Sequence, residues 1–506
     1  MSFAIVNSRA RIGVASPEVI IEVHISNGLP AFQIVGLPET SVREARDRVR
    51  SAIINSQFQF PQTRITVNLA PADLPKEGGR FDLPIAIGIL AASKQLPAER
   101  IKNYEFYGEL SLNGELRNIL GAIPSVIACR DLNHSAVLPK QNAHYAAFVE
   151  GAQCYGADSL LQVFHHLNGQ YQLPLAITPE LQAVEKPNAD SVADLSDIIG
   201  QQQAKRALEI AAAGGHNLLL LGPPGTGKSM LAERLITLLP PMEEREAIET
   251  LAIRSINESS FDPNTWRQRP FRHPHHTASG VALVGGGSIP KPGEIRLAHN
   301  GVLFLDELTE FDRKVIDVLR EPMETGYVSI SRAAQQADFP ARFQLVAAFN
   351  PSPTGSIDDG RTNPEQIQRY LSKLSGPFLD RIEMQVDVPL LPKGSLTNIP
   401  PDTESSSVVK QRVIQSQKIM RQRAGRLNAQ LSGKEITQVC DLSRADNLFL
   451  EQVLEKLRLS IRSYHKILKV ARTIADLAQS PRVERTHIAE ALSYRAMDKL
   501  LANLKH

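Results

Sequence analysis

The chain has 506 residues, more than one hydrophobic core holds, so about three domains are expected. Its 42% apolar and 22% charged residues are those of an ordinary soluble protein. The net charge of +2 excludes a globally basic nucleic-acid binder, so any polyanion surface must be local. The three cysteines, Cys129, Cys154 and Cys440, are widely spaced and form no CxxC pair, which argues against a disulfide framework or a zinc site and fits a reducing cytosol. The longest apolar run, 83–92, is too short to span a bilayer, so we expect a cytoplasmic protein without membrane contact.

Residues 1–175 mix two periodicities. Segments 19–25 and 64–69 alternate as strands do, and segments 41–56 and 82–93 read as helices. This part is therefore predicted to be an α+β domain. The polar stretch 176–192, which is poor in aromatic residues, is predicted to be a linker.

A phosphate-binding loop opens the second part, an α/β block over 193–392. Four leucines at 218–221 predict a buried strand, and Lys228 and Ser229 end a Gly-x-x-x-x-Gly-Lys-Ser motif that leads into a helix. Such loops point backbone N–H groups at a polyphosphate at a helix N-terminus. Lys228 would reach the β and γ phosphates of ATP, and Ser229 would ligate Mg²⁺. The predicted nucleotide-binding residues are Gly222, Pro223, Pro224, Gly225, Thr226, Gly227, Lys228 and Ser229.

Two further apolar strands end in polar side chains. Segment 301–305 runs into Asp306 and Glu307, which suit the Mg²⁺ shell and the activation of an attacking water, respectively. Segment 343–349 ends at Asn350, which could polarise the same water. An Asn followed by Pro is also a common turn opener, so a purely structural Asn350 stays open.

The last part is predicted to be helical. A linker rich in Pro, Ser and Thr spans 393–407, and 408–506 lacks strand alternation. Segment 410–426 carries six basic residues and no acid, so it could neutralise phosphates or form a solvated helix face. Because only 5% of residues are aromatic, single-strand stacking is not expected to dominate any nucleic-acid contact.

The order of Lys228, then Asp306 with Glu307, then Asn350 resembles Walker A, Walker B and sensor 1 of the AAA+ ATPases. That resemblance implies that Ile198 and Ile199 lie in the segment that contacts adenine. It further implies that Arg381, in SGPFLDRIE, is an arginine finger acting on a neighbouring subunit, and that Arg472 is the sensor 2 residue. For both arginines, a plain salt bridge is the alternative.

Between the Walker elements, RPFRHPHHTAS at 269–279 and the glycine run 285–287 resemble the magnesium-chelatase-type branch of AAA+ proteins. The resemblance implies an extra loop in the second helix and a hairpin starting at Tyr327, both facing a central pore. Lys291, Arg296 and Arg332 are then candidates to touch a threaded polymer, or else solvated loop charges. Three histidines within 273–276 would strain a tetrahedral metal site, so His273, His275 and His276 are expected to be structural or nucleotide-adjacent.

Residues 73–88 and 108–123 resemble the active-site segments of Lon-type proteases. In this alignment Arg80 falls on the serine nucleophile and Ile123 on the lysine base. A serine–lysine dyad needs both groups. The N-terminal domain is therefore predicted to be a Lon-protease-like fold without protease activity.

Over its whole length the chain resembles the ComM family of bacterial competence proteins. That resemblance implies a hexameric ATP- and Mg²⁺-dependent DNA helicase or translocase that promotes branch migration on branched or forked DNA, single- and double-stranded, during homologous recombination in natural transformation. A metal-insertion motor related to magnesium chelatase is the main alternative. An ATP-dependent protease and an assembly factor that binds ATP without turnover are weaker ones.

Overall fold

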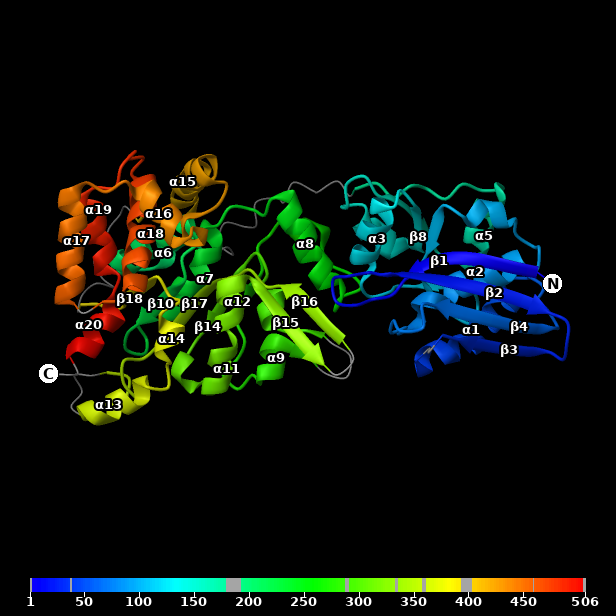
Figure 1. Cartoon of the computed structure of the whole chain (residues 1–506), viewed down its shortest axis with the longest axis horizontal. Coiled ribbons are helices and arrows are strands. Elements are labelled where there is room, and N and C mark those ends of the chain that lie inside the picture. Colours follow the sequence, from blue (N-terminus) through cyan, green and yellow to red (C-terminus); the bar gives the residue numbers. More distant parts are fainter. Residues whose placement is uncertain are drawn as a thin grey trace.

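The computed structural model describes residues 2–36, 39–178, 193–286, 291–332, 335–356, 361–392, 403–457 and 459–503. Most of the two predicted linkers, 179–192 and 393–402, lies outside these ranges. The N-terminal part and the C-terminal helices lie at opposite ends of an elongated molecule, with a central parallel sheet between them (Figure 1). The predicted α/β class is confirmed, whereas the exact domain boundaries stay predictions.

The N-terminal part is built on a seven-stranded sheet in the order β3-β4-β2-β1-β5-β8-β9. The predicted period of two is confirmed on β2, where Val19, Ile21 and Val23 are fully buried. The strands are β1 (Ser2–Arg9), β2 (Glu18–Ser26), β3 (Ala31–Val35), β4 (Arg64–Ala70), β5 (Tyr104–Phe106), β8 (Ser135–Pro139) and β9 (Gln153–Ala157), with a small β6 (Glu109–Leu110) and β7 (Leu116–Arg117) ribbon. The helices are α1 (Thr40–Asn55), α2 (Asp82–Ala92), α3 (Ala122–Asp131), α4 (Lys140–Ala146) and α5 (Leu160–Asn168).

The two positions matched to the protease dyad lie on neighbouring elements. Arg80, in the turn Gly79–Phe81, donates a 2.8 Å hydrogen bond to Ser125 Oγ on α3, the helix that carries buried Ile123. Burial lowers the pKa of Arg80 to about 10. A guanidinium therefore ties together the elements that would carry nucleophile and base. The Lon-type origin of this domain stays a prediction.

The central part contains a five-stranded sheet in the order β11-β14-β17-β10-β18, with all neighbours parallel. β10 and β14 are buried at every residue, because helices cover both faces of such a sheet. Its strands are β10 (Leu218–Leu221), β11 (Phe271–Arg272), β14 (Val302–Leu305), β17 (Gln344–Phe349) and β18 (Met384–Asp387). The surrounding helices are α6 (Gln202–Gly214), α7 (Lys228–Leu238), α8 (Glu244–Ser255), α9 (Gly280–Val284), α10 (Glu294–Leu297), α11 (Arg313–Val318), α12 (Arg320–Thr325), α13 (Pro364–Leu371) and α14 (Gly376–Leu379).

Two strand pairs project from this core. The pair β12 (Gly285–Gly286) and β13 (Lys291–Pro292) follows α9, and the hairpin β15 (Tyr327–Arg332) and β16 (Gln335–Pro340) precedes β17. The hairpin that was predicted to start at Tyr327 is thus present. Both excursions leave the sheet in the positions expected for the chelatase-type branch.

The C-terminal part is helical, as predicted. It comprises α15 (Ser406–Ala424), α16 (Gly433–Cys440), α17 (Arg444–Lys456), α18 (Ile461–Leu477), α19 (Arg485–Ser493) and α20 (Ala496–Asn503). Buried side chains of α15 and α18, including Val413 and Ile467, share one hydrophobic cluster with α6 and β10. These helices therefore pack directly against the domain that contains the parallel sheet.

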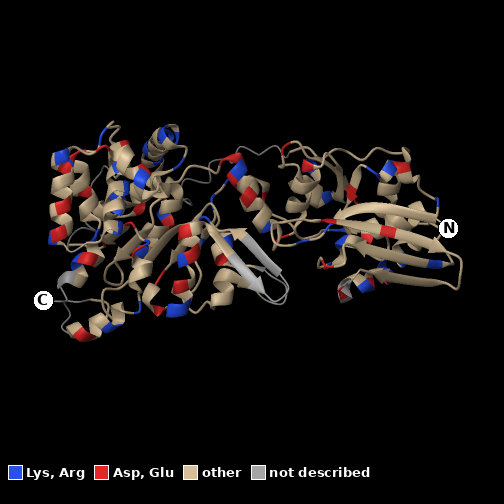
Figure 2. Cartoon of the chain, viewed as in Figure 1, with Lys and Arg blue, Asp and Glu red and all other residues tan. Residues whose placement is uncertain are grey.

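The basic run 410–426 forms most of α15, and its arginines are paired. Arg412 contacts Glu209 and Glu404, and Arg423 makes a bidentate contact with Asp476 at 2.6 and 2.7 Å. Arg421 pairs with Glu243, and Arg426 with Glu435. In Figure 2 the charged positions of α15 are blue, and red positions lie on the neighbouring C-terminal helices. This arrangement favours the structural reading of the run over a phosphate-binding one.

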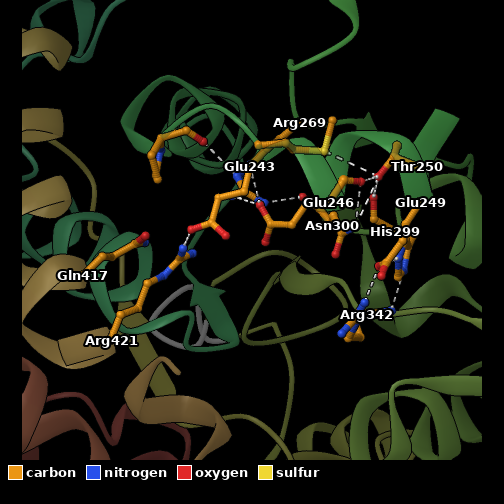
Figure 3. A network of polar contacts seen from close by, with 12 residues as sticks. Glu243, Glu246, Glu249, Thr250, Arg269, His299, Asn300, Arg342, Gln417 and Arg421 are labelled. Atoms are coloured by element: carbon orange, nitrogen blue, oxygen red, sulfur yellow. Dashed lines mark hydrogen bonds and ion pairs between the residues drawn. The ribbon is translucent and has the colours of Figure 1, made fainter. Parts of the chain in front are cut away.

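Helix α8 joins all three parts of the molecule. Its Ala247 and Leu251 share a hydrophobic cluster with α3 of the N-terminal part. On its polar side Glu243, at the cap, pairs with Arg421 of α15, and Glu249 contacts His299 and Arg342 of the core (Figure 3). Helix α8 therefore contacts the N-terminal part, the core and α15.

Candidate nucleotide site

The phosphate loop connects β10 to the start of α7. Gly225 and Gly227 have φ of 78° and 89°, which only glycine adopts without strain. Lys228 Nζ donates to the carbonyl oxygens of Gly222 and Pro223, both at 2.8 Å, and to Asn350 Oδ1 at 3.0 Å. Burial lowers the pKa of the Lys228 ammonium. The lysine is thus held at the mouth of the loop by groups that a phosphate oxygen could replace.

The acidic end of β14 lies beside the same loop. Ser229 Oγ donates a 2.6 Å hydrogen bond to Asp306 Oδ2, and Asp306 Oδ1 accepts from the backbone N–H of Glu307 at 2.9 Å. A hydroxyl and a carboxylate at this separation form the hard oxygen pair that Mg²⁺ prefers. The donor set of Ser229 and Asp306 therefore fits the predicted metal.

The strand order explains why these residues meet. β17 lies between β14 and β10, and the register pairs Leu221 with Phe349, one residue before Asn350. The carboxyl ends of parallel strands lie on the same side of a sheet. The carboxyl ends of β14, β17 and β10 therefore bring Asp306, Asn350 and the phosphate loop together. The predicted grouping of Lys228, Ser229, Asp306 and Asn350 is present in the structure.

The segment predicted to contact adenine flanks the loop. Ile198 is buried and Ile199 is partly buried in the turn before α6. Gln201 follows them with a left-handed φ of 51°, and its side-chain amide donates to Pro389 O at 2.7 Å and to Thr226 O at 3.4 Å. Gln201 thus connects the Ile198–Ile199 segment by hydrogen bonds to the phosphate loop and to the chain after β18.

Arg381 lies near the amino ends of the sheet strands, opposite to the phosphate loop. It precedes β18, whose last residue Asp387 is level with Leu221 at the phosphate-loop edge. A strand of this length spans ~13 Å. In this chain Arg381 pairs with Glu324 and donates to Pro377 O. It is therefore remote from the phosphate loop of this chain.

Arg472 lies in a buried polar cluster of the C-terminal helices. Its guanidinium bonds to Asp476 Oδ1 at 2.9 Å and to the carbonyl oxygens of Ser480 at 2.6 Å and Pro481 at 3.1 Å. All three partners belong to the same helical part, and Arg472 is 1% exposed. The geometry favours the salt-bridge alternative for Arg472 over a direct contact with nucleotide.

The pore candidates divide into two groups. Arg296 is fully buried, and its guanidinium carbon lies 3.4 Å from the centre of the Phe339 ring, where burial lowers its pKa to about 10. A polymer cannot reach it in this arrangement, so the structure does not support its prediction as a DNA contact. Lys291 and Arg332 lie on β13 and β15, and their side chains lie outside the described ones.

The three histidines have separate partners. His273 packs on Phe304, with ring centroids 4.6 Å apart, and His275 Nδ1 lies 2.9 Å from Thr277 Oγ1. His276 Nδ1 lies 3.0 Å from Glu307 Oε2. The sequence predicted structural or nucleotide-adjacent histidines, but it did not predict this contact with the proposed catalytic carboxylate.

Comparison with known proteins identifies the relatives of this chain. The family model "Magnesium chelatase, subunit ChlI" matches residues 194–396, its C-terminal counterpart matches 403–495, and "Subunit ChlI of Mg-chelatase" matches 21–142. The chain is 57% identical to "Competence protein ComM" of Haemophilus influenzae over 100% of both chains. The chain belongs to the ComM family.

Other members of the ComM family resemble the chain along nearly its whole length. A protein named YifB in Escherichia coli is 52% identical, over 100% of this chain and 99% of its own. Rv2897c of Mycobacterium tuberculosis is 41% identical over 96% of each chain. The magnesium-chelatase-like AAA+ core is thus shared across the family. The resemblance to the ComM family that the sequence indicated is confirmed. Within the described ranges, no helix combines the length and apolarity needed to cross a bilayer.

Proposed function

We propose that this ComM-family protein hydrolyses ATP with Mg²⁺ and uses the free energy to move along DNA. The observation that carries the first half is the meeting of Lys228, Ser229, Asp306 and Asn350 at one edge of the sheet. Lys228 binds phosphate oxygens, Ser229 and Asp306 hold the metal, and Glu307 takes a proton from the attacking water. Mg²⁺, when bound, neutralises charge on the phosphate oxygens.

The proposed active unit is a homo-oligomer, with a hexameric ring implied by the family resemblance. Arg381 lies near the amino end of β18, whereas the phosphate loop follows the carboxyl end of β10. Arg381 therefore cannot act on a γ-phosphate bound to the loop of the same chain. A finger supplied by a neighbouring subunit stabilises charge in the transition state and makes hydrolysis depend on assembly.

The proposed substrate is branched or forked DNA in the cytoplasm, and the proposed outcome is branch migration during natural transformation. The name of the Haemophilus influenzae relative, a competence protein, supports this choice. The projecting pairs β12–β13 and β15–β16 supply the surface, with Lys291 and Arg332 as candidate contacts. Since the arginines of α15 are already paired with acids, these projections are the better place for DNA.

The test is an ATPase assay with and without a synthetic four-way junction at fixed salt, together with junction migration on a gel. The junction should raise the ATPase rate several-fold. Glu307→Gln should lower turnover by about 100-fold or more, as loss of a catalytic proton acceptor does. Lys228→Ala should abolish turnover, because it removes the cation that binds the phosphate oxygens. The exposed Lys434 on α16 offers a matched control for the lysine variant. An ATPase rate indifferent to DNA, with immobile junctions, would reject the DNA motor.

Metal insertion into a tetrapyrrole is the second candidate. Its support is the match of three segments to magnesium chelatase models and the resemblance to that subunit in Euglena gracilis, which is 24% identical over 37% of this chain. Metal chelation in the presence of the partner subunits of that enzyme would establish it. We expect none, because full-length similarity lies with the competence protein.

A further inference from the structure

Asn217, the residue before β10, forms hydrogen bonds through its backbone N–H, its carbonyl and both ends of its side-chain amide. The side-chain Nδ2 donates to Arg381 O at 3.0 Å, and Oδ1 accepts from Leu345 N at 2.9 Å. The backbone N–H donates to Glu383 Oε2 at 3.0 Å, and the carbonyl oxygen accepts from Met384 N at 3.2 Å. All of these bonds except the one from Leu345 reach the chain between Arg381 and Met384, where it enters β18.

The side chain at this position must be a donor and an acceptor at once. The N–H of Leu345 needs an acceptor and the carbonyl of Arg381 needs a donor, so the two partners fix which way the Asn217 amide points. A carboxylate in its place keeps the bond from Leu345 but turns an oxygen toward the Arg381 carbonyl. The bond to Arg381 can therefore be removed separately from the bond to β17.

Helix α18 contacts the same turn less closely. Lys466 Nζ lies 3.5 Å from Ile382 O and 3.9 Å from Asp380 Oδ1, beyond the range of about 2.7–3.2 Å for good N–H···O hydrogen bonds. The bonds that Asn217 donates to this turn are shorter, at 3.0 Å. The start of β10, rather than α18, is therefore the closer support of the Arg381 backbone.

Asn217 and the phosphate loop lie at opposite ends of β10. Gly222, where the loop begins, follows Asn217 by five residues (222 − 217), a span of ~16 Å for an extended chain. Asn217 is therefore too far away to touch a nucleotide bound to its own chain. A change at Asn217 reaches ATP hydrolysis through the backbone of Arg381 and leaves the phosphate loop of the same chain in place.

From these contacts we infer that Asn217 is a positioning residue that fixes the backbone of Arg381 for action on the neighbouring subunit. The inference rests on the proposed function, in which Arg381 is a finger supplied in trans. β10 then serves two active sites. Its carboxyl end carries the phosphate loop of one site, and Asn217 at its amino end holds the finger that enters the next.

The test begins with the steady-state ATPase rate of Asn217→Asp in the presence of a four-way junction. Because a misplacement of about 1 Å costs on the order of 100-fold in rate, kcat should fall by about 10- to 100-fold. The KM for ATP should stay within about two-fold, because the phosphate loop of the variant is intact. Asn133→Asp, at an exposed asparagine in the N-terminal part, is the matched control and should keep the natural rate.

Mixtures of variants then show which part of the Asn217→Asp chain is defective. Mixed with Lys228→Ala, it should recover part of the activity, because its intact loop faces an intact finger. Mixed with Arg381→Ala, it should recover none, because each loop then faces a missing or a displaced finger. Asn217→Ala, which also loses the bond from Leu345, should give the same pattern.

The reverse pattern would overturn the inference, because recovery with Arg381→Ala but not with Lys228→Ala places the defect in the loop of the variant itself. An unchanged kcat in Asn217→Asp would overturn it too. So would recovery with both partners, or with neither although mixed oligomers form, since the latter reports a general structural defect. Failure of the proposed function looks different: the mixture of Lys228→Ala with Arg381→Ala is then inactive, and the finger in trans and this inference are rejected together.

Discussion

Ser229 and Asp306 are 77 residues apart in sequence, yet their side chains are joined by a 2.6 Å hydrogen bond. Both oxygens belong to the proposed Mg²⁺ shell. We therefore expect Asp306→Asn to raise the Mg²⁺ concentration needed for half-maximal ATP hydrolysis by at least about 10-fold. The measurement is the ATPase rate as a function of free Mg²⁺. Glu310→Gln, an exposed neighbour, is the control. Equal Mg²⁺ curves for Asp306→Asn and the natural protein would remove Asp306 from the shell.

Arg381 offers a test of action between subunits. Neither Lys228→Ala nor Arg381→Ala alone should hydrolyse ATP, since a missing finger lowers kcat by about 10³-fold. A mixture of the two should recover part of the activity, because an intact loop from one variant then faces an intact finger from the other. Arg369→Ala, an exposed arginine on α13, should stay active. If the mixture stays inactive although mixed oligomers form, Arg381 does not act in trans.

Arg472 is expected to contribute to local stability rather than to catalysis. Its removal leaves carbonyl groups of Ser480 and Pro481 without their donor, although Asp476 keeps Arg423. We expect Arg472→Ala to lower the local stability of α18 and α19 by about 2–4 kcal/mol, as loss of one partner of a buried pair does. Amide hydrogen exchange reports this change. Intact protection together with lost hydrolysis would instead support the sensor 2 role.

Glu249 gives a prediction about pH. The Nδ1 atom of His299 accepts from Arg342 N, so its Nε2–H is the group that faces Glu249. That contact, with the Arg342 guanidinium, lowers the pKa of Glu249 to about 2 from 4.5. Since the folded pKa is the lower one, the stabilisation is present above pH 4.5 and is lost as the pH falls toward 2.

Glu249→Gln should therefore unfold more easily at neutral pH by about 2 kcal/mol, and this difference from the natural protein should shrink as the pH falls from 5 to about 2. Urea denaturation at several pH values measures it. Glu244→Gln, whose side chain is 48% exposed on the same helix, should change little at any pH. A difference that is constant with pH would show that the Glu249 carboxylate is not the stabilising group.

The nucleotide site was the most predictable part of the molecule. The loop Gly222–Ser229 and the ends of β14 and β17 combine a local pattern with a topology that brings parallel strand ends together, so their meeting could be expected. Arg296 was not predictable in the same way. Its environment depends on Phe339, which lies on a hairpin 43 residues later (339 − 296), and a charged residue within a loop pattern reads as exposed until that ring covers it.

Arg472 and His276 show the two kinds of contact that a single sequence hides. Arg472 has its acid partner one helical turn away at Asp476, so the pattern allowed a salt bridge but could not rank it against a nucleotide contact. The partner of His276, Glu307, follows a different strand, and only the pairing of β11 with β14 brings the two segments together. Local periodicity reports elements well, whereas side-chain partners between elements depend on register.

The strand order also determines when the nucleotide site can form during synthesis. β10 carries the phosphate loop, but its two neighbours are β17 (Gln344–Phe349) and β18 (Met384–Asp387), which leave the ribosome more than a hundred residues later. Until then β10 has an unpaired edge on each side, and Lys228 lacks Asn350. A nascent chain that ends before Asn350 therefore has a complete phosphate-loop motif without the full group of Lys228, Ser229, Asp306 and Asn350, so we expect tight ATP binding only after β17 has joined the sheet.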